Sequence, residues 1–496
     1  MNTRPQDPRT QGARVASTGQ AKFFLDSRRD SPACQAPPFL QDLPGPGDVY
    51  EPRFEITRDL ERLIESNAYE GAFESAIDTV SGQGIAELED ITTLDQYYFF
   101  VDAIVSWKPE LRVWGWQGGI YHERTDYLRI TQFYYYFNQP QLKALQSPID
   151  PIAGRELTPI SRWLRDFAVA WGEFLDTEPS SEYLASYRFG PAYAYQDYAG
   201  GESGVDYPTF NKWFSRHFRD IDVQRPVAQP ENHRIITFPA ESTFVGQWTV
   251  STRVEEPAEM RMEPAITVKH VRWPIPELLR DSSHAQDFEG GLLVHSFLNV
   301  YDYHRQHAPV SGTILEARFI PGQVYLEVEL LGPDEQDTMK KQQETSALAN
   351  AVIPSRYLDA DDATGYQFVQ CRGLMVIDSP VGKVAVLPMG MAHVSSVVFM
   401  TQPPDGGGQQ EIRLTPEERS GKSYEEQVEE VNRRLEHELV GKQIEKGDMI
   451  STFLFGGSDM VVVFERKSNV TITAQPGVHY PVRSQYAQAN IARLDP

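Results

Sequence analysis

The sequence predicts an α+β protein in which an N-terminal helical domain is followed by a β-rich domain. Apolar residues recur at helical spacing from about residue 50 to 175, and a period of two dominates after residue 206. The stretch between them is rich in Gly, Ser and Tyr. We therefore divide the chain into a disordered arm (1–45), a helical domain with its linker (46–205) and a β-rich domain (206–496).

The arm is predicted from its composition. Residues 1–45 are rich in Pro, Gln, Arg and Gly, a mixture that cannot bury enough apolar surface to fold. The first 20 residues are basic, as in a transit peptide, but they contain two prolines and no amphipathic stripe. We therefore favour disorder.

Three stretches carry the helical pattern, at residues 54–67, 92–110 and 161–177. The first has an apolar face with i, i+4, i+7, i+8 spacing, formed by Ile56, Leu60, Leu63 and Ile64. An aromatic run at 132–137 is interpreted as helix–helix core, with an aromatic pocket as the alternative. Residues 176–206 have no sustained period, so they form a domain boundary or an ordered loop over an active site.

Short alternating segments predict the strands of the second domain. They read GQWTVSTRV, AITVKHV, GTILEARFI, GQVYLEVELL, GLMVIDS, KVAVLPMGM, VSSVVFM, MVVVFER and VTITA. Two helical pieces interrupt them, at 208–219 and 423–439. The second piece is mostly charged, which favours a solvated insertion over a partner-binding helix.

Charge and cysteine content exclude several function classes. Lys and Arg number 46 against 70 Asp and Glu, which gives a net charge of −24. This charge argues against nucleic-acid binding and against docking on anionic membranes. No run of eighteen apolar residues occurs, so no transmembrane anchor is expected. Two cysteines and no signal-peptide core fit a reducing, cytoplasmic compartment.

His304 and His307, in YHRQHAP, are the first candidates for chemistry. Their i, i+3 spacing would place both on one face of a helical turn. Acid–base work is favoured over metal binding, because the sequence lacks the Glu of HExxH and an obvious third ligand. A structural role on the turn before the next strand is the alternative. Glu241, at a turn between strand-like segments, matters only if the fold brings it to a histidine.

The segment FLFGGSDMVVVFE (453–465) places Gly457 and Ser458 between two apolar runs. Locally a β-turn explains it better than a nucleophile, since the G-x-S-x-G of hydrolase elbows is absent. Carboxylate, His and Ser nevertheless occur in one domain, and a His oriented by a carboxylate can activate a Ser. The Gly457–Ser458 bond is therefore a candidate for an intramolecular acyl shift.

Four blocks together resemble the phosphatidylserine decarboxylase family. Residues 290–314 resemble its YHR-x-H-x-P-x-x-G block, and residues 445–465 its C-terminal self-cleavage block. Residues 207–227, with their Phe-Arg and Arg-Pro pairs, and residues 383–397 are similar to two further motifs. The resemblance covers about residues 207–480 and implies the family's β-rich catalytic fold.

The resemblance implies self-cleavage between Gly457 and Ser458, giving a β-subunit (1–457) and an α-subunit (458–496). Ser458 would become a pyruvoyl group, the cofactor, which forms a Schiff base with a substrate amine and acts as an electron sink. His307 would activate Ser458, Glu241 would orient His307, and His304 would serve the decarboxylation step. The two cleaved chains are then partners of each other.

The sequence departs from the family pattern at two places. Glu241-Ser242 stands where Asp-Gly is usual, so Asp302 is a second-choice orienting acid. Asp459 stands where Thr is usual, beside the future pyruvoyl group, and is the candidate for substrate preference.

Within the family, the chain is similar to a soluble branch of tryptophan decarboxylases that shares FLNV, HAPV and FGGS. The resemblance to this branch favours a free aromatic L-amino acid as the substrate of this chain. The alternative substrate is phosphatidylserine, decarboxylated to phosphatidylethanolamine. A non-catalytic binding protein on the same fold is a third hypothesis, with the GGS loop a mere turn.

Overall fold

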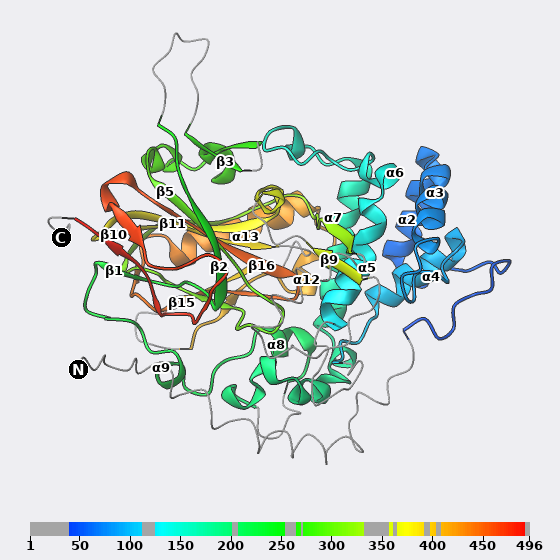
Figure 1. The fold of residues 1–496 in the computed structure, drawn as a ribbon, viewed down its shortest axis with the longest axis horizontal. Coiled ribbons are helices and arrows are strands. Elements are labelled where there is room, and N and C mark those ends of the chain that lie inside the picture. Colours follow the sequence, from blue (N-terminus) through cyan, green and yellow to red (C-terminus); the bar gives the residue numbers. More distant parts are fainter. Residues whose placement is uncertain are drawn as a thin grey trace, which may run out of the picture.

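The computed structural model describes residues 39–111, 125–200, 207–252, 264–268, 271–331, 357–360, 365–390, 397–402 and 408–491. The helices of the first part lie together on one side of the molecule, and the sheets fill the other side (Figure 1). The predicted α+β class, with helices before a β-rich region, is confirmed. Most of the predicted arm, residues 1–38, lies outside the described residues.

The three stretches with helical spacing form helices, and further helices form between them. Their bounds are α2 (Glu55–Asn67), α3 (Glu70–Ser81), α4 (Leu94–Val105), α5 (Thr125–Asn138), α6 (Pro140–Lys143), η4 (Ala153–Arg155) and α7 (Pro159–Leu175). The hydroxyls of Thr93 and Thr158 cap α4 and α7 by accepting backbone N–H groups.

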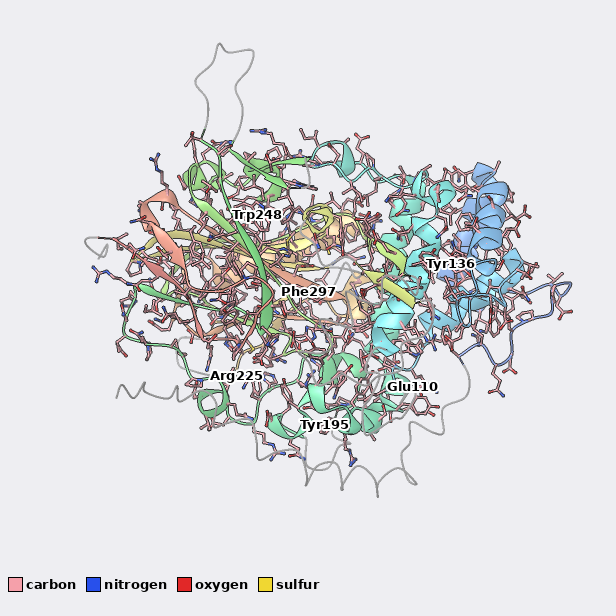
Figure 2. All side chains as sticks on the ribbon, in the orientation of Figure 1. Glu110, Tyr136, Tyr195, Arg225, Trp248 and Phe297 are labelled. Carbon is pink, nitrogen blue, oxygen red and sulfur yellow. The ribbon has the colours of Figure 1, made fainter. Side chains whose placement is uncertain are left out.

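The aromatic run lies in α5 and is helix–helix core. Phe133 stacks on Phe167 of α7 with ring centroids 4.1 Å apart, and Tyr136 lies among the helices (Figure 2).

The segment after α7 consists of short helices. They are η5 (Glu178–Ser181), η6 (Leu184–Phe189), η7 (Pro191–Tyr193), η8 (Tyr195–Asp197), α8 (Phe210–Phe214) and α9 (Ile221–Gln224). The helix predicted over 208–219 is therefore too long. It stops at α8 because Phe218 pairs with Tyr198 in an isolated β-bridge, and their rings stack at 4.7 Å.

The largest sheet has eight strands in the order β14-β7-β10-β11-β16-β5-β2-β18. Their bounds are β14 (Gln443–Ile444), β7 (Gly312–Ile320), β10 (Arg372–Ser379), β11 (Gly382–Gly390), β16 (Gly457–Phe464), β5 (Leu292–Phe297), β2 (Ser242–Thr249) and β18 (His479–Tyr480). Neighbouring strands in this sheet are antiparallel. β16, which carries Ser458, is thus an inner strand with a partner on each side.

Smaller sheets complete the β-rich part. A four-stranded sheet has the order β13-β12-β15-β6, and a three-stranded sheet has the order β1-β19-β17. Their strands are β13 (Glu411–Ile412), β12 (Val397–Met400), β15 (Met449–Phe453), β6 (Arg305–His307), β1 (Ile235–Thr237), β19 (Gln485–Ala489) and β17 (Val470–Ile472). Two two-stranded sheets pair β3 (Ala265–Val268) with β4 (Val271–Pro274), and β8 (Val328–Leu331) with β9 (Tyr357–Ala360). Of the predicted GQVYLEVELL strand, only β8 forms.

Two apolar cores cover the two faces of the eight-stranded sheet. The first is continuous with the helical part, from Leu60 on α2 to Phe464 on β16. The second is closed by the β3–β4 hairpin and by α10 (Ile275–Leu278). The remaining short helices are η10 (Ala285–Phe288), η12 (Tyr366–Val369), α12 (Pro416–Arg419) and η13 (Arg466–Ser468).

The charged helix is confirmed as α13 (Tyr424–Leu439), which packs on β7. A capping box between Ser423 and Glu426 begins it. Leu435 and Leu439 are its buried side chains, so the helix covers the sheet with a narrow apolar edge and leaves its charges in solvent.

Candidate functional site

The Gly457–Ser458 bond lies at the start of an inner strand. β15 ends at Phe453, a turn follows over residues 454–456, and Gly457 already pairs with Gly390 of β11. Gly456 closes this turn with a φ of 102°, a conformation that favours glycine. The β-turn expected at Gly457 and Ser458 therefore lies earlier in the chain, and both residues belong to β16. The side chain of Ser458 lies outside the described residues.

The two histidines do not lie on a helical turn. His307 is the last residue of β6, and His304 directly precedes that strand. Side chains alternate along an extended chain, so residues three apart face opposite sides. This corrects the prediction that both share one face, and it explains why their surroundings differ.

Both ring nitrogens of His307 are hydrogen-bonded. Its Nδ1–H donates to the Gly447 carbonyl at 2.7 Å, and the Tyr303 hydroxyl donates to Nε2 at 3.2 Å. The Arg483 Nε–H donates to the same carbonyl at 2.9 Å. Burial, helped by the positive charge of Arg483, lowers the pKa of His307 to about 3. The imidazole is therefore neutral near pH 7, with Nε2 as its proton-accepting nitrogen.

His304 lies against an aromatic ring, beside the turn that precedes Gly457. Its ring stacks on Phe214 at 3.8 Å, and its Nε2–H donates to the Val300 carbonyl at 3.3 Å. Among the described residues its Nδ1 has no hydrogen-bond partner. Burial, with the nearby charge of Arg216, lowers the pKa of His304 to about 3. A neutral imidazole with a free acceptor nitrogen can take a proton.

Strand register decides which histidine lies nearer the turn. The Phe453 N–H donates to the His304 carbonyl at 2.7 Å, whereas His307 pairs with Met449 at the other end of β15. Phe453 is the last residue of β15 before the turn that precedes Gly457. His304 is thus the histidine beside that end of the strand.

Glu241 reaches the neighbourhood of His307 but bonds elsewhere. The backbone N–H of His307 donates to the Pro239 carbonyl at 2.7 Å. The Glu241 carboxylate accepts two bonds from Arg225, at 2.8 and 2.5 Å, and one from the Val482 N–H at 3.2 Å. Within the described residues it makes no hydrogen bond to His307. The Arg225 guanidinium donates to both carboxylate oxygens at once, which explains why Glu241 binds Arg225 and not His307.

The second-choice acid, Asp302, pairs with a histidine that sequence reasoning missed. The His479 Nε2 lies 2.9 Å from Asp302 Oδ1, and the Asn299 N–H donates to Oδ2 at 2.7 Å. Burial alone would lower the pKa of His479, but the bond and charge of Asp302 outweigh it and raise that pKa. Sequence spacing carries no signal for a pair 177 residues apart.

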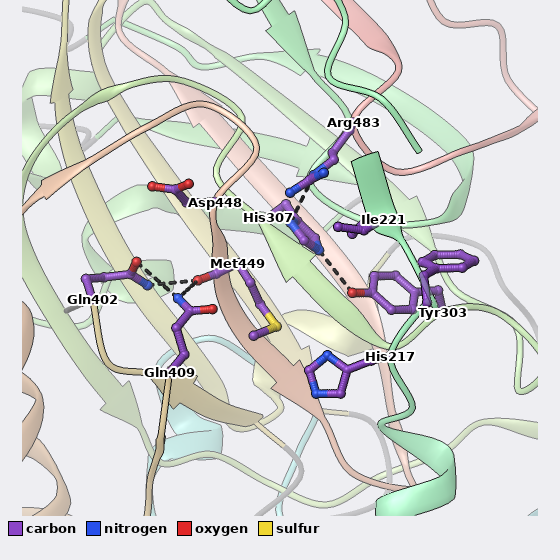
Figure 3. A pocket seen from close by; sticks show the side chains of 10 residues that line it. His217, Ile221, Tyr303, His307, Gln402, Gln409, Asp448, Met449 and Arg483 are labelled. Atoms are coloured by element: carbon purple, nitrogen blue, oxygen red, sulfur yellow. Dashed lines mark hydrogen bonds between the residues drawn. The ribbon is translucent and has the colours of Figure 1, made fainter. Parts of the chain in front are cut away.

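An open pocket of about 460 Å³ lies against His307 (Figure 3). Its lining residues are His217, Phe218, Ile221, Tyr303, His307, Gln402, Gln409, Asp448, Met449 and Arg483. The side chains of Gln402 and Gln409 both donate to the Met449 carbonyl, each at 2.8 Å. The pocket thus combines aromatic walls with several polar groups, as small-molecule sites do.

Asp459 is not among the residues that line that pocket. Its Oδ1 lies 2.7 Å from Nε2 of His295, and both side chains are 0% exposed. A direct contact between Asp459 and a substrate would require this pair to open.

The family model for phosphatidylserine decarboxylase matches residues 210–488. Because the match covers more than half of the 496 residues, the chain belongs to this family, as the sequence blocks predicted.

The relatives are named as decarboxylases of two kinds. The chain is 26% identical to L-tryptophan decarboxylase of Psilocybe cyanescens over 174 residues, 31% of this chain and 38% of that protein. It is 28% identical to phosphatidylserine decarboxylase proenzyme 3 of Schizosaccharomyces pombe over 268 residues, 53% of this chain and 19% of that one. It is 24% identical to decarboxylase iboD of Amanita muscaria over 344 residues, 65% of this chain and 82% of that one. The matched part is thus less than half of the first two relatives.

Two features are absent from the described ranges. None of their helices is long and apolar enough to cross a membrane. No group of three or more His, Cys, Asp or Glu side chains within those ranges could hold a metal ion.

Proposed function

We propose that the chain is a self-processing, pyruvoyl-dependent decarboxylase that removes the α-carboxylate of an amino-acid substrate. One observation carries the proposal. The Gly457–Ser458 bond begins an inner strand, directly after a turn, and the residue before that turn, Phe453, donates its N–H to the carbonyl of the buried, neutral His304. Membership of the decarboxylase family and the names of the relatives support it.

Processing would proceed from the chain's own groups. The Ser458 hydroxyl attacks the Gly457 carbonyl while His307, neutral at pH 7, accepts its proton. The peptide C–N bond then breaks, and the proton passes to the released amine of residue 458. The resulting ester is lost by elimination, which leaves Gly457 as a carboxylate. The dehydrated residue 458 then takes up water and releases ammonia to give the pyruvoyl end. The products are a large chain (1–457) and a small chain (458–496).

The surroundings of His304 fit a pyruvoyl group formed at residue 458. A buried acceptor nitrogen without a partner in the described structure, on a ring stacked against Phe214, suits proton transfer close to a ketone. When present, the ketone would bind the substrate amine covalently and take up the electron pair left by departing carbon dioxide. His304 would hold the proton that the product carbon needs, and Phe214 would keep its ring in place.

Glu241 is proposed to act on His307 through its position. Its segment holds the backbone of His307 through the Pro239 carbonyl, and its own carboxylate is fixed by Arg225. The Arg225-Pro226 pair belongs to a sequence block that resembles the family, which is the signal that could have found this partner.

A free amino acid, probed first with aromatic side chains, is the proposed substrate. A pocket of about 460 Å³ is in the size range of small-ligand sites, and two acyl chains would extend beyond it. The relatives named L-tryptophan decarboxylase support this choice. Phosphatidylserine is the second candidate, favoured by the family model and by the fission-yeast relative. A cytoplasmic location stays a prediction.

The two chains are proposed to stay together after cleavage. β16 pairs with β5 and β11, β18 with β2, and β19 with β1, all across the cut. The Asp302–His479 pair adds a polar link, and Arg483 bonds both Gly447 and Asp222. The large and small chains would thus be partners of each other, and the assembled protein would bind the substrate.

Intact-mass measurement of the purified chain tests this function. We expect a fragment of 39 residues that begins with a pyruvoyl group, and a single uncut chain for Ser458→Ala. An uncut wild-type chain would overturn the proposal. Carbon dioxide release from free aromatic amino acids and from phosphatidylserine vesicles then separates the substrates, and release from vesicles alone would favour the lipid.

A further inference from the structure

A buried acid–imidazole pair directly follows the proposed cleavage site. Asp459 lies on β16 and His295 on β5, and Nε2 of the histidine is 2.7 Å from Oδ1 of the acid. Both side chains are 0% exposed. Asp459 Oδ2 is buried and has no hydrogen-bond partner within the described residues.

The register of the sheet creates this contact. Asp459 pairs with Phe297, and Val461 pairs with His295, so the acid and the imidazole are diagonal neighbours on one face. That face belongs to the second apolar core, which contains Val461 and Val463 from the same strand.

A polar pair is costly at such a place. A buried carboxylate without full hydrogen bonding loses much of its solvation energy, and apolar side chains fill the next two positions on this face. The packing of the sheet therefore does not explain why residue 459 is an acid. Its position, one residue after Ser458, suggests a role connected with the cut.

Cleavage changes how residue 459 is held. Before the cut, the turn at 454–456 connects it covalently to β15. Afterwards residue 458 is a chain end, and chain ends fray unless they are tied down. The remaining ties are backbone pairing with Phe297 and Met389, and the side-chain bond to His295.

We propose that His295 and Asp459 form a positioning pair that holds the new end of the small chain in register after cleavage. Resting on the proposed function, this inference gives Asp459 a task that needs no contact with substrate. The pair fixes the residue to which the reactive end is attached, and so fixes where that end lies relative to His304. Its contribution should be larger in the cut protein than in the uncut one.

Thermal unfolding of cut and uncut protein tests the pair. Asp459→Asn and His295→Gln are made in the wild-type chain and in the uncut Ser458→Ala chain, and intact mass verifies the state of each. We expect each substitution to lower Tm by about 3 °C more in the cut form, and to lower kcat per cut chain at least threefold with little change in KM. Both substitutions together should cost little more than one.

Val463→Ala is the matched control. Val463 lies on the same strand and in the same core, farther from the cut, and its side chain is 0% exposed. It should lower Tm equally in both forms.

Equal losses for Asp459→Asn in cut and uncut protein would overturn the pair's role and leave the proposed function standing. A variant that folds but is not cut would also overturn it, because the pair would then act before the bond breaks. A wild-type chain that is itself uncut would overturn the proposed function and this inference together.

Discussion

His304 and His307 are three residues apart, and both imidazoles are buried and neutral, yet their surroundings are opposite. His307 lies among polar partners, with Gly447 and Tyr303 bonding both of its nitrogens. His304 stacks on Phe214 and keeps one nitrogen without a partner in the described structure. The alternation of an extended chain separates them, and a helical turn would have placed them together.

The difference teaches how one short motif can serve two reactions. A fully bonded histidine has a fixed tautomer and orientation, which suits a single proton transfer during processing. A histidine with a free acceptor nitrogen, on a ring stacked against Phe214, suits a reaction in which substrate enters and supplies the missing partner. The predictions below test this division of roles.

His307→Ala gives the largest expected effect. Loss of a general base slows a reaction by roughly 100-fold or more, so cleavage should nearly stop. The fraction of cut chain, followed over time by intact mass, measures it. His217→Ala removes an imidazole that lines the same pocket but lies outside β6, and it should be cut at the normal rate. Normal cleavage of the His307 variant would end its assignment as base.

His304→Ala should leave cleavage intact and lower kcat of the cut protein by about 100-fold. The physical reason is the loss of the nitrogen that holds the product's proton, while His307 still serves processing. Carbon dioxide release per cut chain is the measurement. The variant tests the division of roles directly, because the register on β15 places His304 nearer the turn than His307, and yet His307 is the proposed base for cleavage. If His304→Ala blocks cleavage instead, the two roles must be exchanged.

Sequence patterns predicted much of the fold. The run GTILEARFI coincides with β7 because its apolar positions alternate. β5 was missed, since its residues are buried on both faces and show no period. β6 has three residues, too few for a pattern, and the predicted helical turn at the histidines was wrong for that reason.

The sequence predicted which residues form the candidate site, but it did not predict which groups those residues contact. The blocks pointed to Ser458, His307 and His304, but which groups they meet depends on tertiary structure. Arg225 binds Glu241 only because two loops meet. The contact between Asp459 and His295 follows from strand parity, since a one-residue shift would turn Asp459 to the other face of the sheet, away from His295.

Acid should destabilise the protein through both histidines. Their pKa values, about 3 in the folded chain, lie below the ordinary 6.5, so the unfolded chain binds more protons between these limits. The free energy of unfolding therefore falls as pH drops from about 6.5, by up to roughly 1.4 kcal/mol per pH unit for each histidine. Urea unfolding of the uncut Ser458→Ala chain at pH 7 and pH 5 measures it. Adding His304→Gln and His307→Gln should flatten the dependence, and an unchanged slope would show that other groups cause it.

The smallest expected effect isolates the aromatic stack on His304. Phe214→Leu removes the stacked ring 3.8 Å from the imidazole, an interaction worth about 0.5–1.5 kcal/mol. We expect kcat to fall about threefold with cleavage unaffected, because His307 does not touch this ring. Phe210→Leu is the control: it lies on the same helix and packs on Phe455 and Phe214. Equal losses of kcat in both variants would mean that general packing of α8 matters, and that the stack gives His304 no special orientation.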